Sequence, residues 1–242
     1  MNREYHKWFS KSLQREMELL IFGWSGRAVL FFPTRMARFY DYENWGIVDA
    51  MRSQIDAGQV QLFCVDSIDG ESFYNEQLHP YNRMERHLQY ESYILNEVVP
   101  LIKAKNNGDW LETAGCSMGA YHALNLAMKY PRLFKKAVGM SGRYDLTSNP
   151  GDFKDLLDGY RNETVYLNMP GQYISNLTDC DMLDALRKLE VIIAVGETDP
   201  FLPGNREFSA LLGNKGIPNQ FHQWESNAHR PHYWRRMVPL YI

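Results

Sequence analysis

The chain has 242 residues, 45% of them hydrophobic, and a formal net charge of −3 at pH 7. This length and composition fit a globular domain with a sizeable core, and the small net charge argues against nucleic acid or an anionic membrane as a partner. Cys64, Cys116 and Cys180 form an odd, sparse set that argues against a disulfide framework, and their spacing does not resemble a zinc site. We therefore predict a reducing compartment and no metal site.

The N-terminal segment MNREYHKWFSKSLQREMELL is charged and lacks the apolar centre of a signal peptide. No apolar run approaches the roughly 20 residues of a membrane span. We expect a cytoplasmic protein with no membrane partner, and we leave open whether it forms a homo-oligomer.

Short apolar runs bounded by turn residues predict strands at residues 18–22, 28–32, 60–65, 111–114, 137–140, 191–195 and 220–224. Helical patterns follow at residues 45–55, 82–105, 121–130 and 233–241. Pro100 is expected to kink the second of these helices or to end it early. Alternation of strand and helix predicts an α/β protein with a mostly parallel sheet.

Two segments depart from this alternation. The turn Gly23-Trp24-Ser25-Gly26 between the first two strands is too short for a crossover, which predicts that these strands form an antiparallel edge. Residues 142–189 show no strand pattern, and we expect them to cover the sheet edge as a lid-like insert. No linker marks a second domain, so residues 1–242 are predicted to form a single domain.

One short motif carries the strongest chemical signal. Gly115-Cys116-Ser117-Met118-Gly119 is a G-x-S-x-G, with an apolar strand before it and a helical segment after it. This is the context of a nucleophile elbow, in which a strained turn exposes the serine Oγ and small neighbours are needed. The amide of Met118 would then point at a developing oxyanion. Cys116 is not at the elbow position and is interpreted as a small buried residue.

A serine hydroxyl becomes a good nucleophile only when a base removes its proton. In this type of fold the acid and the base follow the serine in the order Ser, Asp or Glu, His. Asp199 follows the strand predicted at 191–195 and precedes Pro200, which makes it the favoured acid. Glu197 is the rival.

The histidine should lie in a loop after the last strand. His229, in the polar loop 225–230, is our candidate for the base, and His232 is the alternative. His222 falls inside the predicted strand, where a structural role is more common. The other histidines precede or adjoin the elbow in the wrong order.

A second oxyanion donor should come from the loop after the strand at 28–32. Pro33 has no amide proton, so the amides of Thr34 and Arg35 are the candidates. The side chains of Arg35 and Arg38 could instead meet an acidic part of a substrate or could simply be solvated. Aromatic residues could line an acyl or sugar pocket or pack in the core: Tyr144, Tyr160, Tyr166, Tyr173, Trp45 and Trp234.

With these motifs in place, the chain resembles the esterase D-type branch of the α/β-hydrolase superfamily, the "putative esterase" family. The resemblance covers most of the chain and is carried by FFPTRMARFYDYENWG, GCSMGAYHALNLAMKYPRLFKKAVGMSGRYDL, YRNETVYLNMPGQYISNL and GETDPFLPGNREFSALLGNKGIPNQFHQWESNAHRPHYW. It implies an α/β-hydrolase fold with helices on both faces of the sheet. It also implies that Ser117, Asp199 and His229 serve as nucleophile, acid and base, which favours Asp199 over Glu197.

Two positions depart from the family pattern. Many relatives carry His-Gly-rich residues where this chain has Pro33-Thr34-Arg35, and many have Asp directly after the catalytic histidine where this chain has Arg230. These departures concern substrate preference more than the reaction.

The expected activity is that of a serine carboxylic-ester hydrolase acting through an acyl-enzyme on a small or carbohydrate-linked ester, with no metal or organic cofactor. The family also contains acyltransferases, so transfer to an alcohol by the same triad is an alternative. A third hypothesis is a non-catalytic binding protein that has kept the fold. The order Ser, Asp, His argues against this last hypothesis.

Overall fold

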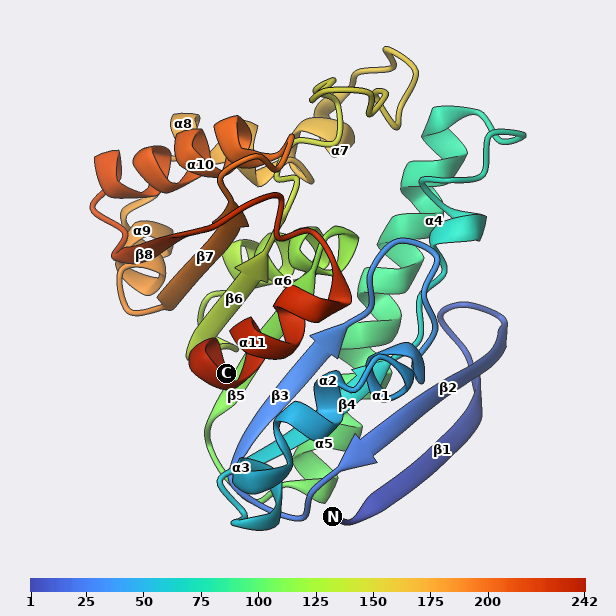
Figure 1. Cartoon of the computed structure of the whole chain (residues 1–242). Helices are drawn as coiled ribbons and strands as arrows, with labels where there is room; N and C mark the ends of the chain where they lie inside the picture. Colours follow the sequence, from blue (N-terminus) through green and yellow to red (C-terminus); the bar gives the residue numbers. More distant parts are fainter.

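Eight strands form one mixed sheet in the order β1-β2-β4-β3-β5-β6-β7-β8, and the computed structural model describes all residues, 1–242 (Figure 1). The strands are β1 (Arg3–Ser10), β2 (Arg15–Phe22), β3 (Arg27–Phe32), β4 (Val60–Val65), β5 (Leu111–Cys116), β6 (Lys136–Met140), β7 (Glu190–Gly196) and β8 (Asn219–Trp224). The pairs from β4 to β8 are parallel, and β2 pairs antiparallel with β1 and with β4. The run VIIAV in β7 is apolar throughout because a strand inside a parallel sheet is covered on both faces.

Helices cover both faces of this sheet (Figure 1). One face carries α1 (Asp41–Asn44), α2 (Ile47–Ala50), α3 (Arg52–Asp56) and α11 (Pro231–Tyr241). The other carries α4 (Pro80–Tyr93), α5 (Val99–Lys105), α6 (Met118–Lys129), α8 (Pro170–Asn176), α9 (Cys180–Leu186) and α10 (Leu202–Asn214). The predicted α/β-hydrolase type of fold, with an antiparallel N-terminal edge and helices on both faces, is confirmed. None of these helices combines the length and the apolar character needed to cross a bilayer.

The prediction that the first two apolar runs, now β2 and β3, pair with each other was wrong. β2 pairs antiparallel with β4, with Leu19 opposite Val65, and β4 separates β2 from β3. The turn at residues 23–26 therefore passes over the start of β4 instead of closing a hairpin. A Cβ on Gly26, where φ is +93°, would lie 2.2 Å from the carbonyl carbon of Gln59. Only glycine allows the turn to run this close to a neighbouring backbone.

Three further differences have local causes. β1 was not predicted, because it is an edge strand whose residues alternate between exposed and partly buried positions as far as Phe9. The helix predicted at 45–55 starts only after Gly46, which takes a left-handed φ of 69°, and it is divided at Met51 into α2 and α3. The helix predicted at 82–105 continues through Pro100, with a π-helical turn, η2 (Ile94–Val98), directly before it. In a regular helix the proline ring would meet the carbonyl of Asn96, and the wider turn lies at that point.

The parallel strands bring their carboxyl ends to one edge of the sheet. Phe32 at the end of β3 is opposite Gly115, Cys116 at the end of β5 is opposite Met140, and Gly196 at the end of β7 is opposite Trp224. The loops that follow these strands therefore meet above this edge, which is where ligands bind in open α/β sheets.

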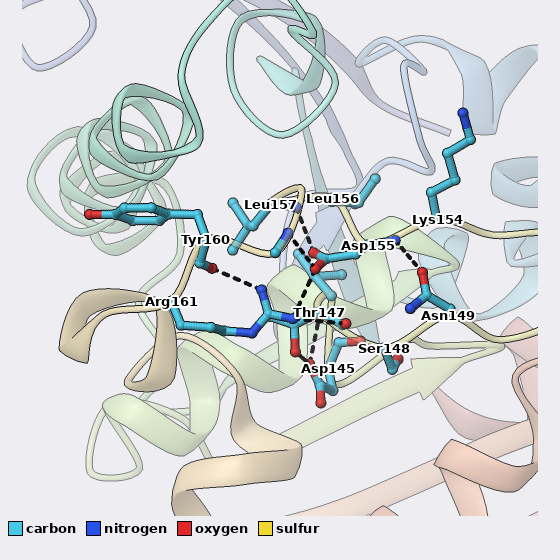
Figure 2. A network of polar contacts seen from close by, with 12 residues as sticks. Asp145, Thr147, Ser148, Asn149, Lys154, Asp155, Leu156, Leu157, Tyr160 and Arg161 are labelled. Carbon is cyan, nitrogen blue, oxygen red and sulfur yellow. Dashed lines mark hydrogen bonds and ion pairs between the residues drawn. The ribbon is translucent and has the colours of Figure 1, made fainter.

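Residues 142–189 contain no strand, as predicted, and include α7 (Glu163–Tyr166), α8 and α9. Near α7 the segment extends past the carboxyl ends of the strands (Figure 1). Its part from 145 to 161 is held by its own polar contacts, among them Thr147 Oγ1 to Asp145 at 2.6 Å and Arg161 Nη2 to Asp155 at 2.8 Å (Figure 2). That this segment acts as a lid, and that the chain is one domain, stay predictions.

Burial of His87 on α4 predicts sensitivity of the fold to acid. Burial lowers the pKa of His87 well below its ordinary value of 6.5, and the nearby His122 lowers it further. Below pH 6.5 the unfolded chain takes up a proton that the folded chain excludes, so stability is lost as the pH falls, by up to about 1.4 kcal/mol per pH unit. We expect His87→Leu to lose less stability than the wild type between pH 7 and pH 5.5, measured by urea unfolding. His232→Gln, at an exposed position, should retain the wild-type loss, and an equal loss in all three proteins would contradict this assignment.

Candidate active site

Ser117 lies in the sharp turn between β5 and α6, with φ 55° and ψ −117°. For a residue with a side chain this conformation is strained, and such strain persists only where surrounding contacts impose it. Here the contacts come from Tyr42, whose hydroxyl donates to the carbonyl of Phe32 at 2.7 Å and accepts from the amide of Cys116 at 3.1 Å. Tyr42 thereby ties the end of β5 to the end of β3 just before the serine.

The glycines on either side of Ser117 are required by close backbone packing. A Cβ on Gly115 would lie 2.2 Å from the carbonyl carbon of Gly119, and a Cβ on Gly119 would lie 2.2 Å from the carbonyl oxygen of Phe32. Any larger residue would push α6 away from β5 and β3. The G-x-S-x-G spacing thus follows from the space available at the turn.

Asp199 and His229 are joined by a hydrogen bond. His229 Nδ1 lies 2.9 Å from Asp199 Oδ2, and Asp199 Oδ1 accepts from the amide of Phe201 at 2.9 Å. The Asp199 side chain is fully buried, whereas the imidazole is 18% exposed. Because a carboxylate can only accept, Nδ1 is the protonated nitrogen and Nε2 carries the lone pair.

The loop that carries His229 is fixed to the loop after β7. The amide of Thr198 donates to the carbonyl of Ser226 at 3.1 Å, and the amide of Ser226 donates to Glu197 Oε1 at 3.0 Å. A Cβ on Gly196 would lie 1.9 Å from the carbonyl oxygen of Asn227, so the two loops are in backbone contact. The acid and the base are therefore held at a fixed separation.

Ser117 and His229 open into the same pocket, of about 290 Å³. Its lining consists of Thr34, Arg35, Tyr74, Ser117, Met118, Arg143, Leu146, Phe153, Phe201, His229 and Trp234. Neither Ser117 Oγ nor His229 Nε2 has a hydrogen-bond partner, and neither atom is sealed from solvent. Hydrogen bonds between a nucleophile and its base commonly close only when substrate is bound.

Three backbone amides at this pocket are free to bind an anion. The amides of Thr34, Arg35 and Met118 donate no hydrogen bond within the protein. Met118 is the first residue of α6, so its amide also carries the positive end of the helix dipole. A carbonyl oxygen that gains negative charge beside Ser117 would meet donors that no other group occupies.

The alternative candidates lie elsewhere. Glu197 is exposed and accepts the Ser226 amide, and it does not contact the imidazole of His229. His232 is exposed, and His222 packs against the ring of Tyr241 at a centroid distance of 4.7 Å. The structure holds no group of three or more His, Cys, Asp or Glu side chains arranged to bind a metal ion.

The two arginines considered from the sequence differ in their surroundings. Arg38 is held by Asp66 at 2.8 Å and by Glu18 at 2.9 Å and does not line the pocket. Arg35 lines the pocket and has no ion-pair partner; its guanidinium lies 5.5 Å from the ring centroid of Tyr74.

Of the aromatic candidates, Trp234 alone lines the pocket that contains Ser117. The others pack in the apolar clusters or bind neighbours: Trp45, Tyr144, Tyr160, Tyr166 and Tyr173. Tyr144 also lines a second pocket next to the first.

Sequence reasoning missed several lining residues: Tyr74, Arg143, Leu146, Phe153 and Phe201. Burial raises the pKa of Tyr74 to about 12, so its hydroxyl stays a neutral donor. Arg143 could have been found, because it lies three residues after β6, which is between the strands that carry Ser117 and Asp199. For the others the sequence carries no comparable signal.

The cysteines give a test of the packing around the elbow. Cys64 and Cys116 are buried, and burial raises the pKa of both thiols, whereas Cys180 is exposed. Because the thiolate is the reactive form, iodoacetamide should modify only Cys180 in the folded protein and all three thiols after denaturation, as counted by mass spectrometry. Alkylation of Cys116 in the folded protein would show that the strand end beside Ser117 is open.

Comparison with known proteins identifies a family and a shared fold. The family model described as "Putative esterase" matches residues 40–239. A solved ferulic acid esterase has a TM-score of 0.79 and 20% identity over 99% of this chain and 95% of its own. An S-formylglutathione hydrolase from Agrobacterium tumefaciens has a TM-score of 0.76 and 16% identity over 98% and 91% of the two chains.

A third structure, the S-formylglutathione hydrolase FrmB from Staphylococcus aureus, has a TM-score of 0.71 and 17% identity over 99% of this chain and 94% of its own. At these identities the structures establish a shared fold. No curated protein matches the sequence.

Proposed function

Since this chain belongs to the putative esterase family and is an esterase, we propose that it hydrolyses small or carbohydrate-linked carboxylic esters through an acyl-enzyme formed on Ser117. The observation that carries the proposal is the hydrogen bond of 2.9 Å between His229 Nδ1 and Asp199 Oδ2. It leaves the lone pair of Nε2 open to the pocket that contains Ser117 Oγ.

In the proposed reaction, Ser117 Oγ attacks the ester carbonyl carbon while His229 Nε2 takes the hydroxyl proton. Asp199 keeps the imidazole in the required tautomer and stabilises its charged form. The amides of Met118 and of Thr34 or Arg35 bind the oxyanion, and each could contribute about 3 kcal/mol to the transition state.

His229 then gives its proton to the alcohol oxygen as the C–O bond breaks, which leaves the acyl group on Ser117. A water molecule enters, loses a proton to Nε2, and attacks the acyl carbon. His229 returns this proton to Ser117 Oγ as the bond between Oγ and the acyl carbon breaks, which releases the carboxylic acid and restores the hydroxyl of Ser117. In this scheme the residues named above and one water molecule supply every group that the two steps use.

The test is hydrolysis of 4-nitrophenyl acetate with rapid mixing. The proposal predicts a burst of 4-nitrophenolate that approaches one equivalent of enzyme wherever deacylation is the slower step, followed by steady turnover with release of acetate. A rate no higher than that of the heat-denatured protein, for this ester and for the 4-nitrophenyl butanoate control, would contradict the proposal.

A further inference from the structure

The pocket that contains Ser117 carries an unbalanced positive charge. Its only lining side chains with a permanent charge are Arg35 and Arg143, and no carboxylate lines it. Asp199 lies beneath the imidazole with both oxygens already engaged. Neither arginine forms an ion pair, whereas Arg38 nearby is paired with both Asp66 and Glu18.

Arg143 is unusual because its guanidinium is buried without an ion pair. The residue is 7% exposed, and it follows β6 at the carboxyl edge of the sheet. Its Nη2 donates to the backbone carbonyls of Leu146 at 3.1 Å and Lys154 at 2.6 Å, and also to that of Ser148. All three acceptors are neutral; they hold the side chain in place, and its charge is balanced only at longer range, by Asp145 and Asp155.

The remaining nitrogens of Arg143 are unused. Nε is buried and has no hydrogen-bond partner. Nη1 also makes no hydrogen bond, but it is not among the atoms sealed from solvent, and the residue lines the pocket that contains Ser117. Burial lowers the pKa of Arg143, yet a guanidinium stays protonated at neutral pH.

Arg143 also stands between two cavities. A second pocket of about 530 Å³ lies between residues 142–151 and the start of α10, and it shares Arg143 and Phe201 with the first. The carboxylates of Asp145 and Glu207 line this second pocket, so the excess of positive charge belongs to the pocket that contains Ser117. A substrate with its ester carbon at Ser117 can therefore place a second group against Arg143 and extend further past it. Arg35 faces the first pocket from the opposite loop, after β3.

We propose that this esterase selects esters bearing a carboxylate or another anionic group, with Arg143 and Arg35 binding that group. The inference rests on the proposed function. A planar guanidinium with free N–H groups suits a carboxylate, and a charge already removed from water binds an anion more strongly than a solvated one. Anchoring of residues 146–154 by Nη2 is compatible with this role, since it fixes the guanidinium while Nη1 stays free.

The experiment compares pairs of esters that differ in one charge. Charge on the acyl side is tested with mono-4-nitrophenyl glutarate against its neutral 4-nitrophenyl glutaramate counterpart. Charge on the alcohol side is tested with 4-acetoxybenzoate against 4-acetoxybenzamide. In at least one pair the wild type should favour the anion in kcat/KM by roughly tenfold or more, because hydrogen bonds to charged groups are the strong ones. The pair that shows the preference identifies the side of the ester that carries the charge.

Arg143→Gln and Arg35→Gln should each reduce this preference severalfold, chiefly by raising KM for the anionic ester. Arg52→Gln, which removes the same charge from α3 where Arg52 contacts only Asp49, should retain it. A purely structural role of Arg143 would lower the rates of both esters of a pair equally and leave their ratio unchanged. If Arg143→Gln does not fold, the wild-type ratio and Arg35→Gln still decide the matter.

The outcomes separate the two proposals. Hydrolysis of both esters of each pair with ratios near one would overturn the anion preference and leave the esterase proposal standing. A clear wild-type preference that survives in both arginine variants would overturn the assignment to these residues. If the enzyme hydrolysed none of the four esters and not the 4-nitrophenyl acetate used above, the proposed function would be overturned, and this inference with it.

Discussion

Ser117→Ala is expected to lower kcat/KM for 4-nitrophenyl acetate by about 10⁴-fold or more. The substitution removes the atom that forms the acyl bond, while the amides of Met118 and Thr34 and the imidazole of His229 remain. Any residual hydrolysis should therefore come from these amides and the imidazole acting on bound ester, with no burst of 4-nitrophenolate. The measurement is steady-state and rapid-mixing kinetics on the purified variant.

Ser141→Ala is the matched control. Ser141 also takes a left-handed φ of 55°, and it follows β6 as Ser117 follows β5. It is fully buried and does not line the pocket. Its replacement should keep kcat/KM near the wild-type value. If both variants lost activity equally, or if Ser117→Ala kept its burst, Ser117 would not be the nucleophile.

Asp199→Asn is expected to lower kcat by about 10³- to 10⁴-fold with little change in the fold. The carboxylate accepts two hydrogen bonds, from His229 Nδ1 and from the Phe201 amide. An asparagine has one oxygen for these two donors. If that oxygen keeps the Phe201 amide, the NH₂ group faces Nδ1 and forces the proton onto Nε2, where it blocks the base.

Glu197→Gln provides the comparison for Asp199→Asn. Glu197 Oε1 accepts the Ser226 amide, and a glutamine oxygen can accept it as well, so activity should stay near that of the wild type. Circular dichroism and the unfolding midpoint should match among the three proteins. A larger loss in Glu197→Gln than in Asp199→Asn would reverse the choice of acid.

The sequence was most informative where local geometry restricts the residue type. The elbow could be predicted because the close approach of Gly115, Gly119 and Phe32 excludes any side chain at the two glycine positions. The buried parallel strands could be predicted because both of their faces are covered, which requires continuous apolar runs. The order Ser, Asp, His then followed from the rule that loops after parallel strands meet at one edge.

The sequence was least informative where distant segments decide the outcome. The short turn at residues 23–26 favours a hairpin, and its true path depends on the backbone of Gln59, which approaches from another part of the chain. The lining of the pocket that contains Ser117 also comes from distant segments. Tyr74 precedes α4, and Phe153 belongs to the segment 145–161, which is held by polar contacts among its own residues (Figure 2). No spacing in the sequence relates these residues to Ser117.

The surroundings of the arginines also depend on tertiary contacts. From the sequence, Arg35 and Arg38 are equivalent candidates for binding an acidic group. In the structure Asp66 and Glu18 neutralise Arg38, and Arg35 is left with the ring of Tyr74. Ion pairing between residues so far apart in sequence cannot be predicted from spacing.

The most direct measurement of the central claim is the position of a covalent adduct with a fluorophosphonate, which reacts preferentially with an activated serine hydroxyl. Incubation of the native protein, digestion and tandem mass spectrometry should place one phosphonyl group on Ser117. The same treatment should leave Ser117→Ala unlabelled and should label Asp199→Asn far more slowly than the wild type. An adduct on another residue, or a wild-type protein that stays unlabelled while folded, would contradict the account.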